Sequence, residues 1–454
     1  MGIKHRSLNL SNGKNRSAVA ILGCGTVGGA TAGLLTDDIE FLKKRTNIDF
    51  FLKYVIDIDF THARSIGIDT SLLTDNYDAV LADPEVEIIV ELMGGITTAR
   101  DYAKKALSAG KHLVTANKAL LASYGVELYR LARENNVTVS FEASCGGGIP
   151  VVRALYDGLI ANRNEAIYGI VNGTCNYILT EMTEHGKSYE EALNGAREKG
   201  LAEADPTLDV SGMDSAHKLA ILSSLAFGLQ VELDSIPVSG IDSLALFDVL
   251  SGKELGYIIK LIAMAKVHDG KLALRVAPSF ISTEHPLAWI SGPFNAISVY
   301  SHATGHTMYY GRGAGGSPTA SAIVSDIISV LLGTASASFG KLPLWPDLSA
   351  KGEILPPEED SGKYYLRINV KDRPGVLAKI ASVFARHSIS IASVLQKEPA
   401  EEEADIYVPI VITTHRAAAG SIEKAIAEID GFDFTRGNSV YLSIIDEHTE
   451  ALKH

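Results

Sequence analysis

The chain has 454 residues, too many for one ordinary hydrophobic core, so two or three domains are expected. Apolar residues make up 46% and charged residues 21%, proportions typical of a globular protein. The formal net charge of −13 argues against nucleic acid or an anionic membrane as the main partner. The cysteines Cys24, Cys145 and Cys175 show no pairing pattern, which fits a reducing compartment.

The beginning of the chain, residues 1–16, is basic and polar and lacks the apolar segment of a secretory signal. No apolar run elsewhere is long enough to span a membrane. We therefore expect a cytoplasmic protein that needs neither a membrane nor a nucleic acid.

Strands and helices alternate over residues 17–141. Strands are predicted at 17–22, 51–56, 87–93, 112–116 and 137–141, and helices at 29–35, 102–107 and 120–135. This alternation predicts an α/β domain, a Rossmann-like doubly wound parallel sheet.

A glycine motif follows the first strand and opens the first helix, the context in which GxGxxG binds a dinucleotide. Its candidate cofactor-binding residues are Gly23, Gly25, Thr26, Val27 and Gly28. Asp57 ends the second strand, where a carboxylate accepts a hydrogen bond from a ribose 2′-hydroxyl and favours NAD over NADP. The alternatives are a glycine-rich turn of another α/β protein and a solvated loop acid. Arg64 lies downstream of Asp57 and could instead meet a phosphate.

Two further polar motifs follow strand ends. Lys118 follows Thr115 and Asn117 and could face a cofactor or a substrate carbonyl, although it could equally be an ordinary helix-start lysine. Glu142 precedes a run of three glycines, 146–148, whose backbone carbonyls could bind a hard cation together with the carboxylate. A zinc site at Cys145 and Cys175 has no ligand spacing to support it.

Residues 142–310 form a mixed region, predicted as a catalytic and dimerisation domain. Helices are expected near 189–199 and 257–267, and strands near 167–171, 272–276 and 296–300. A polar, turn-prone cluster at 172–176 could line a substrate pocket or cap a helix.

Residues 200–218 place four carboxylates and a lysine just before a nearly all-apolar helix. Asp214 and Lys218 stand four residues apart, on one face of that helix. Most pairs at this spacing are exposed salt bridges, but the apolar surroundings predict a buried pair with a partner or a chemical task.

The remaining chain contains a second glycine-rich helix start and a small module. The segment 311–348 carries Gly315 and an apolar helix at 320–332, and is expected to return to the dinucleotide domain. Residues 349–362 read as a linker rich in proline and acid. Residues 363–446, with an acidic loop at 401–403, follow the order βαββαβ of a ferredoxin-like module.

Taken together, these motifs resemble the homoserine dehydrogenase family. The resemblance runs in order through the glycine loop and the motifs at 115–118, 141–150, 172–179, 200–222 and 311–327. The tail, with residues 372–377, resembles an ACT regulatory domain. The resemblance implies reversible NAD(P)-dependent reduction of L-aspartate 4-semialdehyde to L-homoserine, in threonine, methionine and isoleucine biosynthesis, by a homodimer or homotetramer.

The resemblance also implies roles for single residues. Lys218 would be the general acid and base, assisted by Lys118. The substrate amino group would be held by Glu203 and Asp214, supported by Asp209 and Thr174, and the nicotinamide end would be approached by Gly200 and Gly315. A sodium site would comprise Glu142 and the carbonyls of Cys145, Gly147 and Ile149, and a threonine effector would bind near Asp372, Arg373, Pro374 and Gly375.

Two other functions remain open on the sequence. The first is a phosphorylating semialdehyde dehydrogenase with Cys175 or Cys145 as a thiolate nucleophile. The second is a sensor that binds nucleotide and amino acid without turnover.

Overall fold

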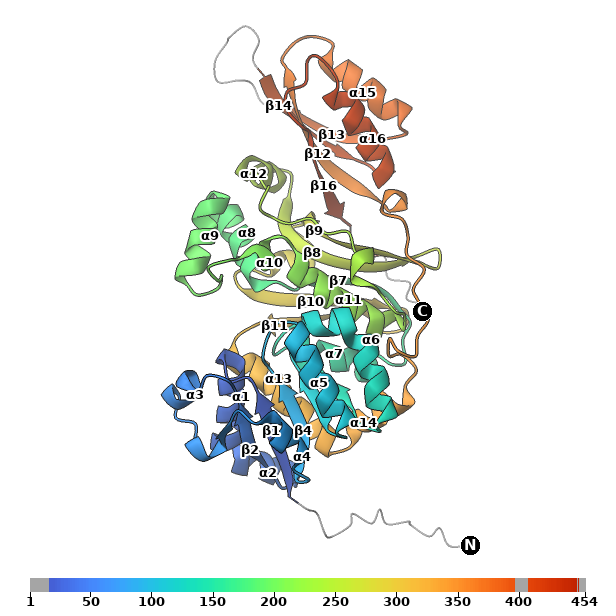
Figure 1. Cartoon of the computed structure of the whole chain (residues 1–454). Coiled ribbons are helices and arrows are strands. Elements are labelled where there is room, and N and C mark those ends of the chain that lie inside the picture. The colour runs from blue at the N-terminus through green and yellow to red at the C-terminus, as the bar shows by residue number, and fades with distance from the viewer. Residues whose placement is uncertain (1–15, 397–406, 447, 449–454) are drawn as a thin grey trace, which may run out of the picture. The chain divides into compact units, whose positions relative to one another are not determined.

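The computed structural model describes residues 16–396, 407–446 and 448 (Figure 1). The basic N-terminal segment before Arg16 and the acidic loop at 401–403 lie outside the described residues. The structure comprises two compact units. One holds the chain up to Ser144 together with Gly315–Leu342, and the other holds Cys145–Ala314 together with the chain from Pro343.

The first unit is built on a six-stranded parallel sheet with the order β3-β2-β1-β4-β5-β6. Its strands are β1 (Ser17–Leu22), β2 (Phe50–Ile56), β3 (Leu73–Thr74), β4 (Val86–Glu91), β5 (His112–Thr115) and β6 (Val139–Ser140). The order reverses between β1 and β4, so ligands are expected at the carboxyl ends of these two strands. The predicted doubly wound sheet is confirmed.

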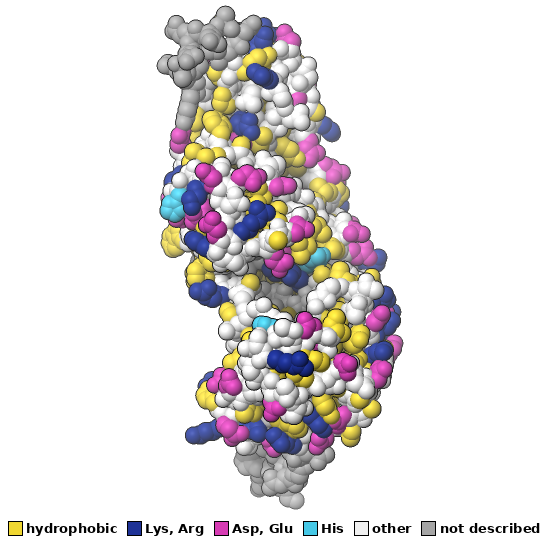
Figure 2. Space-filling model, turned by 60° about the vertical axis from the view of Figure 1, so that its left-hand side comes forward, with side chains coloured by type: hydrophobic (Ala, Val, Ile, Leu, Met, Phe, Trp, Pro, Cys, Tyr) yellow, Lys and Arg dark blue, Asp and Glu magenta, His cyan; other side chains and the backbone are white. Residues whose placement is uncertain are grey.

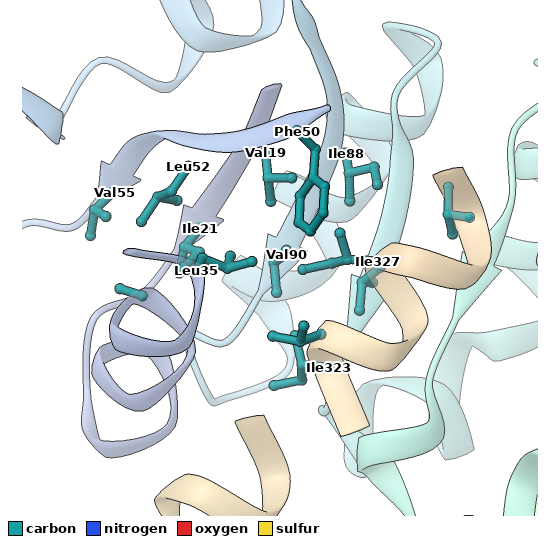
Figure 3. Close-up of a cluster of buried hydrophobic side chains, with 14 of the residues drawn as sticks. Val19, Ile21, Leu35, Phe50, Leu52, Val55, Ile88, Val90, Ile323 and Ile327 are labelled. Carbon is teal, nitrogen blue, oxygen red and sulfur yellow. The ribbon is translucent and has the colours of Figure 1, made fainter. Parts of the chain in front are cut away.

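Helices complete this unit. They are α1 (Thr26–Asp37), α2 (Ile39–Thr46), α3 (Thr61–Ser65), α4 (Tyr77–Ala82), α5 (Thr97–Ser108), α6 (Lys118–Glu134), α13 (Gly316–Leu331) and α14 (Thr334–Lys341), with short turns η1 (Thr70–Leu72) and η2 (Glu142–Ser144). Figure 3 shows Ile323 and Ile327 of α13 beside Val19, Phe50 and Val90 of the sheet. This late segment therefore contributes to the core of the first unit.

The second unit contains a mixed ten-stranded sheet. Five of its strands come from residues 164–312 and lie in the order β11-β10-β7-β8-β9. They are β7 (Asn164–Ile170), β8 (Tyr257–His268), β9 (Lys271–Ser282), β10 (Phe294–Ser301) and β11 (Gly305–Arg312). The helix predicted at 257–267 is wrong, because these residues form β8, which pairs antiparallel with β7 and β9.

Helices α7 to α12 belong to the same unit. They are α7 (Val151–Arg153), α8 (Gly173–His185), α9 (Tyr189–Glu198), α10 (Thr207–Val210), α11 (Met213–Phe227) and α12 (Leu246–Glu254), with short turns η3 (Ala154–Gly158), η4 (Leu233–Ser235) and η5 (Pro286–Trp289). Helix α11 is buried over nearly its whole length, as its apolar sequence predicts.

The C-terminal module has the predicted βαββαβ order. Its elements are β12 (Ser361–Lys371), α15 (Val376–Arg386), β13 (Ile391–Gln396), β14 (Tyr407–Thr414), the short β15 (Ala417–Ala418), α16 (Ala419–Asp430) and β16 (Val440–Ile445). The strand order β16-β12-β14-β13 is that of a ferredoxin-like fold, and helices α15 and α16 cover one face (Figure 1). The predicted linker 349–362 includes the turn η6 (Pro357–Glu359) and the first two residues of β12.

The module shares both a sheet and a buried ion pair with the rest of its unit. Strand β16 pairs parallel with β9, and the hydroxyls of Ser443 and Ser279 lie 2.8 Å apart. Asp248 of α12 is 1% exposed and accepts two hydrogen bonds from Arg367 of β12, at 2.6 and 3.0 Å, and one from the Tyr365 hydroxyl at 2.9 Å. The C-terminal module is thus anchored by polar groups as well as by backbone pairing.

Charged side chains of both signs are mixed on the surface, and the described helices carry few long apolar runs. On the face shown in Figure 2, Lys and Arg side chains are interspersed with Asp and Glu. Within the described residues, no single helix is long and apolar enough to cross a membrane. The bent pair α13 and α14 passes that test jointly by length and composition, with an angle of 78° between the two helices.

Candidate functional site

The glycine loop after β1 leaves open space at the start of α1. Gly23 has φ +97°, and a Cβ there would lie 2.7 Å from the Leu92 carbonyl oxygen. A Cβ on Gly28 would lie 2.0 Å from the Gly23 carbonyl oxygen, whereas a Cβ on Gly25 would meet no atom within 4 Å. Gly25 is also the N-cap of α1 and provides no side-chain cap. The loop therefore offers uncapped backbone N–H groups to a pyrophosphate, and the residues present fit a dinucleotide.

Asp57 fixes this loop from the end of β2. Its Oδ2 accepts a hydrogen bond from the Cys24 amide at 2.6 Å, and its Oδ1 accepts one from the Ile58 amide at 2.7 Å. Asp57 thus shapes the glycine loop in addition to its predicted contact with a ribose, a structural role that the motif alone did not indicate.

The loop offers a test that separates folding from cofactor binding. Gly25→Ala is expected to leave thermal stability unchanged and to weaken NAD(P)H binding at least tenfold, about 1.4 kcal/mol, because the methyl group occupies the phosphate position. Gly28→Ala is expected to destabilise the fold itself by about 1–3 kcal/mol, because its Cβ collides with backbone. Thermal unfolding and NADH fluorescence titration distinguish the two, and equal effects of both variants would contradict this assignment.

A buried glutamate that the sequence analysis missed lies at the end of β4. Glu91 is fully buried and accepts a hydrogen bond from the Thr115 hydroxyl at 2.6 Å, while the same hydroxyl accepts one from the Asn117 amide at 3.0 Å. Burial raises the pKa of Glu91 above its ordinary value. Asn117 caps α6 through the Leu120 amide, so this chain of contacts positions Lys118, the first residue of α6.

In the second unit, Lys218 lies at the centre of a buried polar cluster. Its side chain is 10% exposed, and Nζ donates to Asp214 Oδ2 at 2.7 Å and to the Val171 carbonyl at 2.6 Å. The Asn172 amide nitrogen donates to Asp214 Oδ2 at 2.8 Å and to Asp209 Oδ1 at 2.7 Å. The predicted pair of Asp214 and Lys218 is therefore buried and in direct contact. The Asn172 side-chain amide joins Asp214 to the second acid, Asp209.

The pKa of Asp209 is shifted by its position in this cluster. Burial, followed by the neighbouring Asp214 charge, raises the pKa of Asp209 above its ordinary value. A cationic ligand would lower the pKa of Asp209 again, because a nearby positive charge stabilises the ionised carboxyl.

The other predicted substrate residues lie at different depths. Thr174 is buried at the start of α8, and its hydroxyl donates to the Leu201 carbonyl at 2.7 Å. Gly200 has φ +66° and open space at its Cβ position. Glu203 is exposed in the segment between α9 and α10 and forms no hydrogen bond or ion pair with any described residue. The structure thus brings Asp209, Asp214 and Lys218 together, but not Glu203.

A second buried lysine, also missed by the sequence analysis, supports the start of α8. Lys260 of β8 is 2% exposed and donates to Asn176 Oδ1 at 3.1 Å and to the Ile290 carbonyl at 2.6 Å. Asn176 in turn donates to the carbonyls of Gly292 and Phe294 at 2.9 and 3.1 Å. Burial lowers the pKa of Lys260 from its ordinary 10.5 to about 8.

This shift gives a pH dependence of stability. Between the folded pKa of about 8 and the unfolded value of 10.5, the unfolded chain holds a proton that the folded chain has released, so stability rises with pH in this window. Lys260→Met is expected to lack this rise, which amounts to about 3 kcal/mol across the window. Urea unfolding at several pH values, with the exposed Lys363→Met as control, measures the difference, and parallel curves for wild type and Lys260→Met would contradict it.

The predicted metal ligands are divided between the units, with the backbone from Cys145 to Ile149 in the second and Glu142 in the first. Gly146 and Gly147 have φ +80° and +56°, which turns the backbone between Cys145 and Ile149 twice within a few residues. Glu142 is buried in η2 of the first unit, where its amide donates to Asp326 Oδ2 of α13 at 2.8 Å. Among the described residues, no group of three or more His, Cys, Asp or Glu side chains could hold a metal. A cation here would therefore depend on carbonyl oxygens together with the Glu142 carboxylate, which are the ligands of a hard cation.

Gly315 and the predicted effector loop are placed at helix starts. Gly315 has φ +118° and is the N-cap of α13 in the first unit. Gly375, with φ +92°, is the N-cap of α15, and residues 372–375 are exposed. The Asp372 carboxylate accepts from the Gln396 amide at 3.1 Å, and Arg373 lies 3.3 Å from Asp433.

Comparison with known proteins covers nearly the whole chain. The family models described as "Homoserine dehydrogenase, NAD binding domain" and "Homoserine dehydrogenase" match residues 23–142 and 150–328, and an ACT domain model matches residues 364–431. A homoserine dehydrogenase of Pseudomonas aeruginosa is 41% identical over 94% of this chain and 98% of its own. The chain belongs to the homoserine dehydrogenase family.

Further homoserine dehydrogenases agree in sequence and in structure. That of Neisseria gonorrhoeae is 40% identical over 91% of this chain and 95% of its own. The structure from Thiobacillus denitrificans superposes with a TM-score of 0.89 at 39% identity, covering 95% of this chain and 98% of that one. A hyperthermophilic archaeal homoserine dehydrogenase in complex with NADPH has a TM-score of 0.57 at 26% identity, over 70% of this chain and 98% of that one.

Membership of the homoserine dehydrogenase family makes the chain an NAD(P)-dependent oxidoreductase acting on a CH–OH group. The alternative with a cysteine nucleophile does not fit the structure. Cys175 is fully buried, its thiol donates to the Asp209 carbonyl at 3.2 Å, and burial raises its pKa well above the ordinary value. Cys145 is likewise fully buried. A reactive thiolate needs the opposite environment.

The cysteine alternative has a direct test in this homoserine dehydrogenase. Cys175→Ser is expected to keep kcat close to that of the wild type, because the serine hydroxyl can still donate to the Asp209 carbonyl and no thiolate is consumed. Steady-state kinetics checks it, and abolished turnover in a folded Cys175→Ser protein would contradict it.

Proposed function

We propose that the chain interconverts L-aspartate 4-semialdehyde and L-homoserine with Lys218 as the proton donor and acceptor. The observation that carries this proposal is the buried contact of Lys218 with Asp214 and the Val171 carbonyl. Bound NAD(P)H supplies the hydride to the aldehyde carbon. Lys218 Nζ, an ammonium with three donors, delivers the proton to the aldehyde oxygen, and in the reverse direction it removes the proton of the hydroxyl.

The carboxylates beside Lys218 suit the amino group of the same substrate. Asp209 of α10 and Asp214 in the first turn of α11 are joined through the Asn172 side chain. Because these two acids lie beside one lysine, the cluster has an excess of negative charge. We assign the substrate ammonium group to this pair, with Thr174 in support. Glu203 is assigned to the same group, and it would have to reach it from the exposed segment before α10.

For the cofactor, we assign the pyrophosphate to Gly23, Gly25, Thr26, Val27 and Gly28, and the adenosine ribose to Asp57. A carboxylate at this position repels a 2′-phosphate, so NADH is expected to be preferred over NADPH. Lys118, Gly200 and Gly315 are assigned to the nicotinamide end. Each lies at a helix start or a glycine turn that leaves the backbone accessible.

The test is reduction of L-aspartate 4-semialdehyde by the full chain with NADH and, separately, with NADPH. We expect one homoserine formed for each nicotinamide oxidised, without inorganic phosphate, and a higher kcat/KM with NADH. Turnover that requires phosphate and yields an acyl phosphate would overturn the proposal in favour of the cysteine mechanism. Binding of both ligands without turnover would favour a sensor.

We further assign a sodium ion to Glu142 and the carbonyls of Cys145, Gly147 and Ile149. Two successive left-handed glycines in this loop support the assignment, because they let neighbouring carbonyls turn to one side. The ion would hold the backbone of the loop, and no chemical step is assigned to it. Replacing sodium by choline in the assay is expected to lower activity, and an unchanged rate would overturn the assignment.

The ACT domain is proposed to make the enzyme responsive to threonine through Asp372, Arg373, Pro374 and Gly375. The exposed loop and the open Cβ position of Gly375 support this, since a ligand could approach the uncapped start of α15. Most soluble oligomers are symmetric assemblies of one chain, and a cytoplasmic homodimer or homotetramer is proposed as well. Asp372→Asn is expected to raise the threonine concentration needed for inhibition without changing uninhibited turnover, and an unchanged threonine response would overturn the assignment.

A further inference from the structure

A second polar cavity lies within the second unit, where the C-terminal module meets the β7-β8-β9 sheet. Its volume is about 230 Å³, and it is lined from both sides. Lys266 of β8 and Arg275 of β9 come from one side, and Tyr364 of β12 and Arg416 come from the other. Pockets for drug-sized ligands measure about 300–1,000 Å³, so this one suits a single smaller metabolite.

The cavity combines both signs of charge with an excess of cations. Asp360, 8% exposed, lies 2.7 Å from Lys266 Nζ and 3.8 Å from the Arg275 guanidinium. Asp446 lies 3.2 Å from the Arg416 guanidinium. Two histidines, His268 and His448, complete the ionisable lining. Three side chains of Lys and Arg therefore face two carboxylates.

A buried phenol in the same cavity has a neighbouring donor but no acceptor for its own proton among the described residues. Tyr364 is 2% exposed, and its hydroxyl lies beside the Arg275 guanidinium, which can only donate to it. The hydroxyl's own proton has no acceptor among the described residues. Burial raises the pKa of Tyr364 to about 12, so the hydroxyl remains a donor at neutral pH. Buried donors without an acceptor are rare in proteins, and a ligand oxygen here would accept from this hydroxyl.

We propose that this cavity binds a small α-amino acid as a zwitterion. Its carboxylate is held by Arg275 and the Tyr364 hydroxyl, which together offer a charged and a neutral donor. Its ammonium group is held by the acids, Asp360 and Asp446. A ligand here contacts both the β7-β8-β9 sheet and the C-terminal module. Its binding therefore stabilises the packing of the module against that sheet.

This site is separate from the loop at 372–375. The cavity includes Ser361 and Gly362 at the start of β12, whereas the loop follows the end of the same strand at Lys371. A strand of this length spans about 30 Å at the usual rise per residue. One amino acid cannot occupy both places, and the proposal does not depend on the catalytic assignment.

Calorimetric titration of the full chain with each proteinogenic L-α-amino acid tests the proposal. We expect one or more of them to bind at this cavity with one molecule per chain, in addition to any ligand at the 372–375 loop. Arg275→Met should weaken that binding at least tenfold and Tyr364→Phe severalfold. Lys351→Met, which breaks an exposed ion pair with Glu232 outside the cavity lining, should leave it unchanged. The corresponding amino-acid amide should bind far more weakly than the acid.

Three results would overturn it. The first is that no amino acid binds the wild-type chain. The second is that binding survives both Arg275→Met and Tyr364→Phe but is lost in Asp372→Asn, which places the ligand at the exposed loop. The third is that the amide binds as tightly as the acid. Should Arg275→Met fail to fold, Tyr364→Phe decides alone, since it removes one oxygen atom and no charge.

Discussion

Replacing Lys218 by methionine is expected to lower kcat by about 10²–10⁴-fold, the usual contribution of a positioned general acid. Methionine fills similar space but offers no proton to the aldehyde oxygen. Steady-state rates in both directions measure the loss, and NADH fluorescence titration should show unchanged cofactor binding. A kcat like that of the wild type would contradict the role of Lys218.

A matched variant separates this chemical effect from loss of an ion pair. Lys187 also pairs with a helical carboxylate, Glu181 of α8, and neither residue takes part in the hydrogen bonds of the polar cluster around Lys218. Lys187→Met should therefore keep its activity. Circular dichroism and thermal unfolding of Lys218→Met are needed as well, because the variant leaves the buried Asp214 with fewer donors.

The second large effect is expected at the buried pair between α12 and the C-terminal module. Arg367→Met should lower the free energy of unfolding by about 3–5 kcal/mol, because it leaves the Asp248 carboxylate buried without its cation. The double variant Asp248→Leu with Arg367→Met should recover most of this loss, since it removes both charges. Urea unfolding of the full chain measures each step of the cycle.

Tyr365→Phe provides a graded control in the same place. It removes one hydrogen bond to Asp248 and keeps the ion pair, so a loss of about 1 kcal/mol is expected. If Arg367→Met costs no more than Tyr365→Phe, the pair does not anchor the module.

Local patterns were sufficient for most elements, and they failed where two faces of a strand are buried. Residues 257–267 read as a helix because Leu, Ala, Met and Lys are good helix formers and few polar residues mark a second face. In the structure these residues lie between two partner strands, and periodicity alone does not separate such a strand from a buried helix.

In the candidate site, contacts between residues close in sequence were predictable, and contacts between distant residues were not. Asp214 and Lys218 were predictable because four residues of helix bring them together. Glu91 and Thr115 are 24 residues apart, and Lys260 and Asn176 are 84 apart, so no local spacing could link them. The contact of Asp248 with Arg367 spans 119 residues and depends on how two domains pack.

The parallel pairing of β16 with β9 has a consequence for how the chain is completed. Residues 443–445 are synthesised about 160 positions after their partners 279–281, so β9 presents an unpaired edge until the chain is nearly finished. Unpaired edges are the usual starting points of aggregation. A chain cut after Pro357 keeps that edge open permanently and also leaves Asp248 without Arg367. The C-terminal module therefore also supplies the strand that covers the β9 edge, and point substitutions, not truncation, are the appropriate way to test whether the module has a role in regulation.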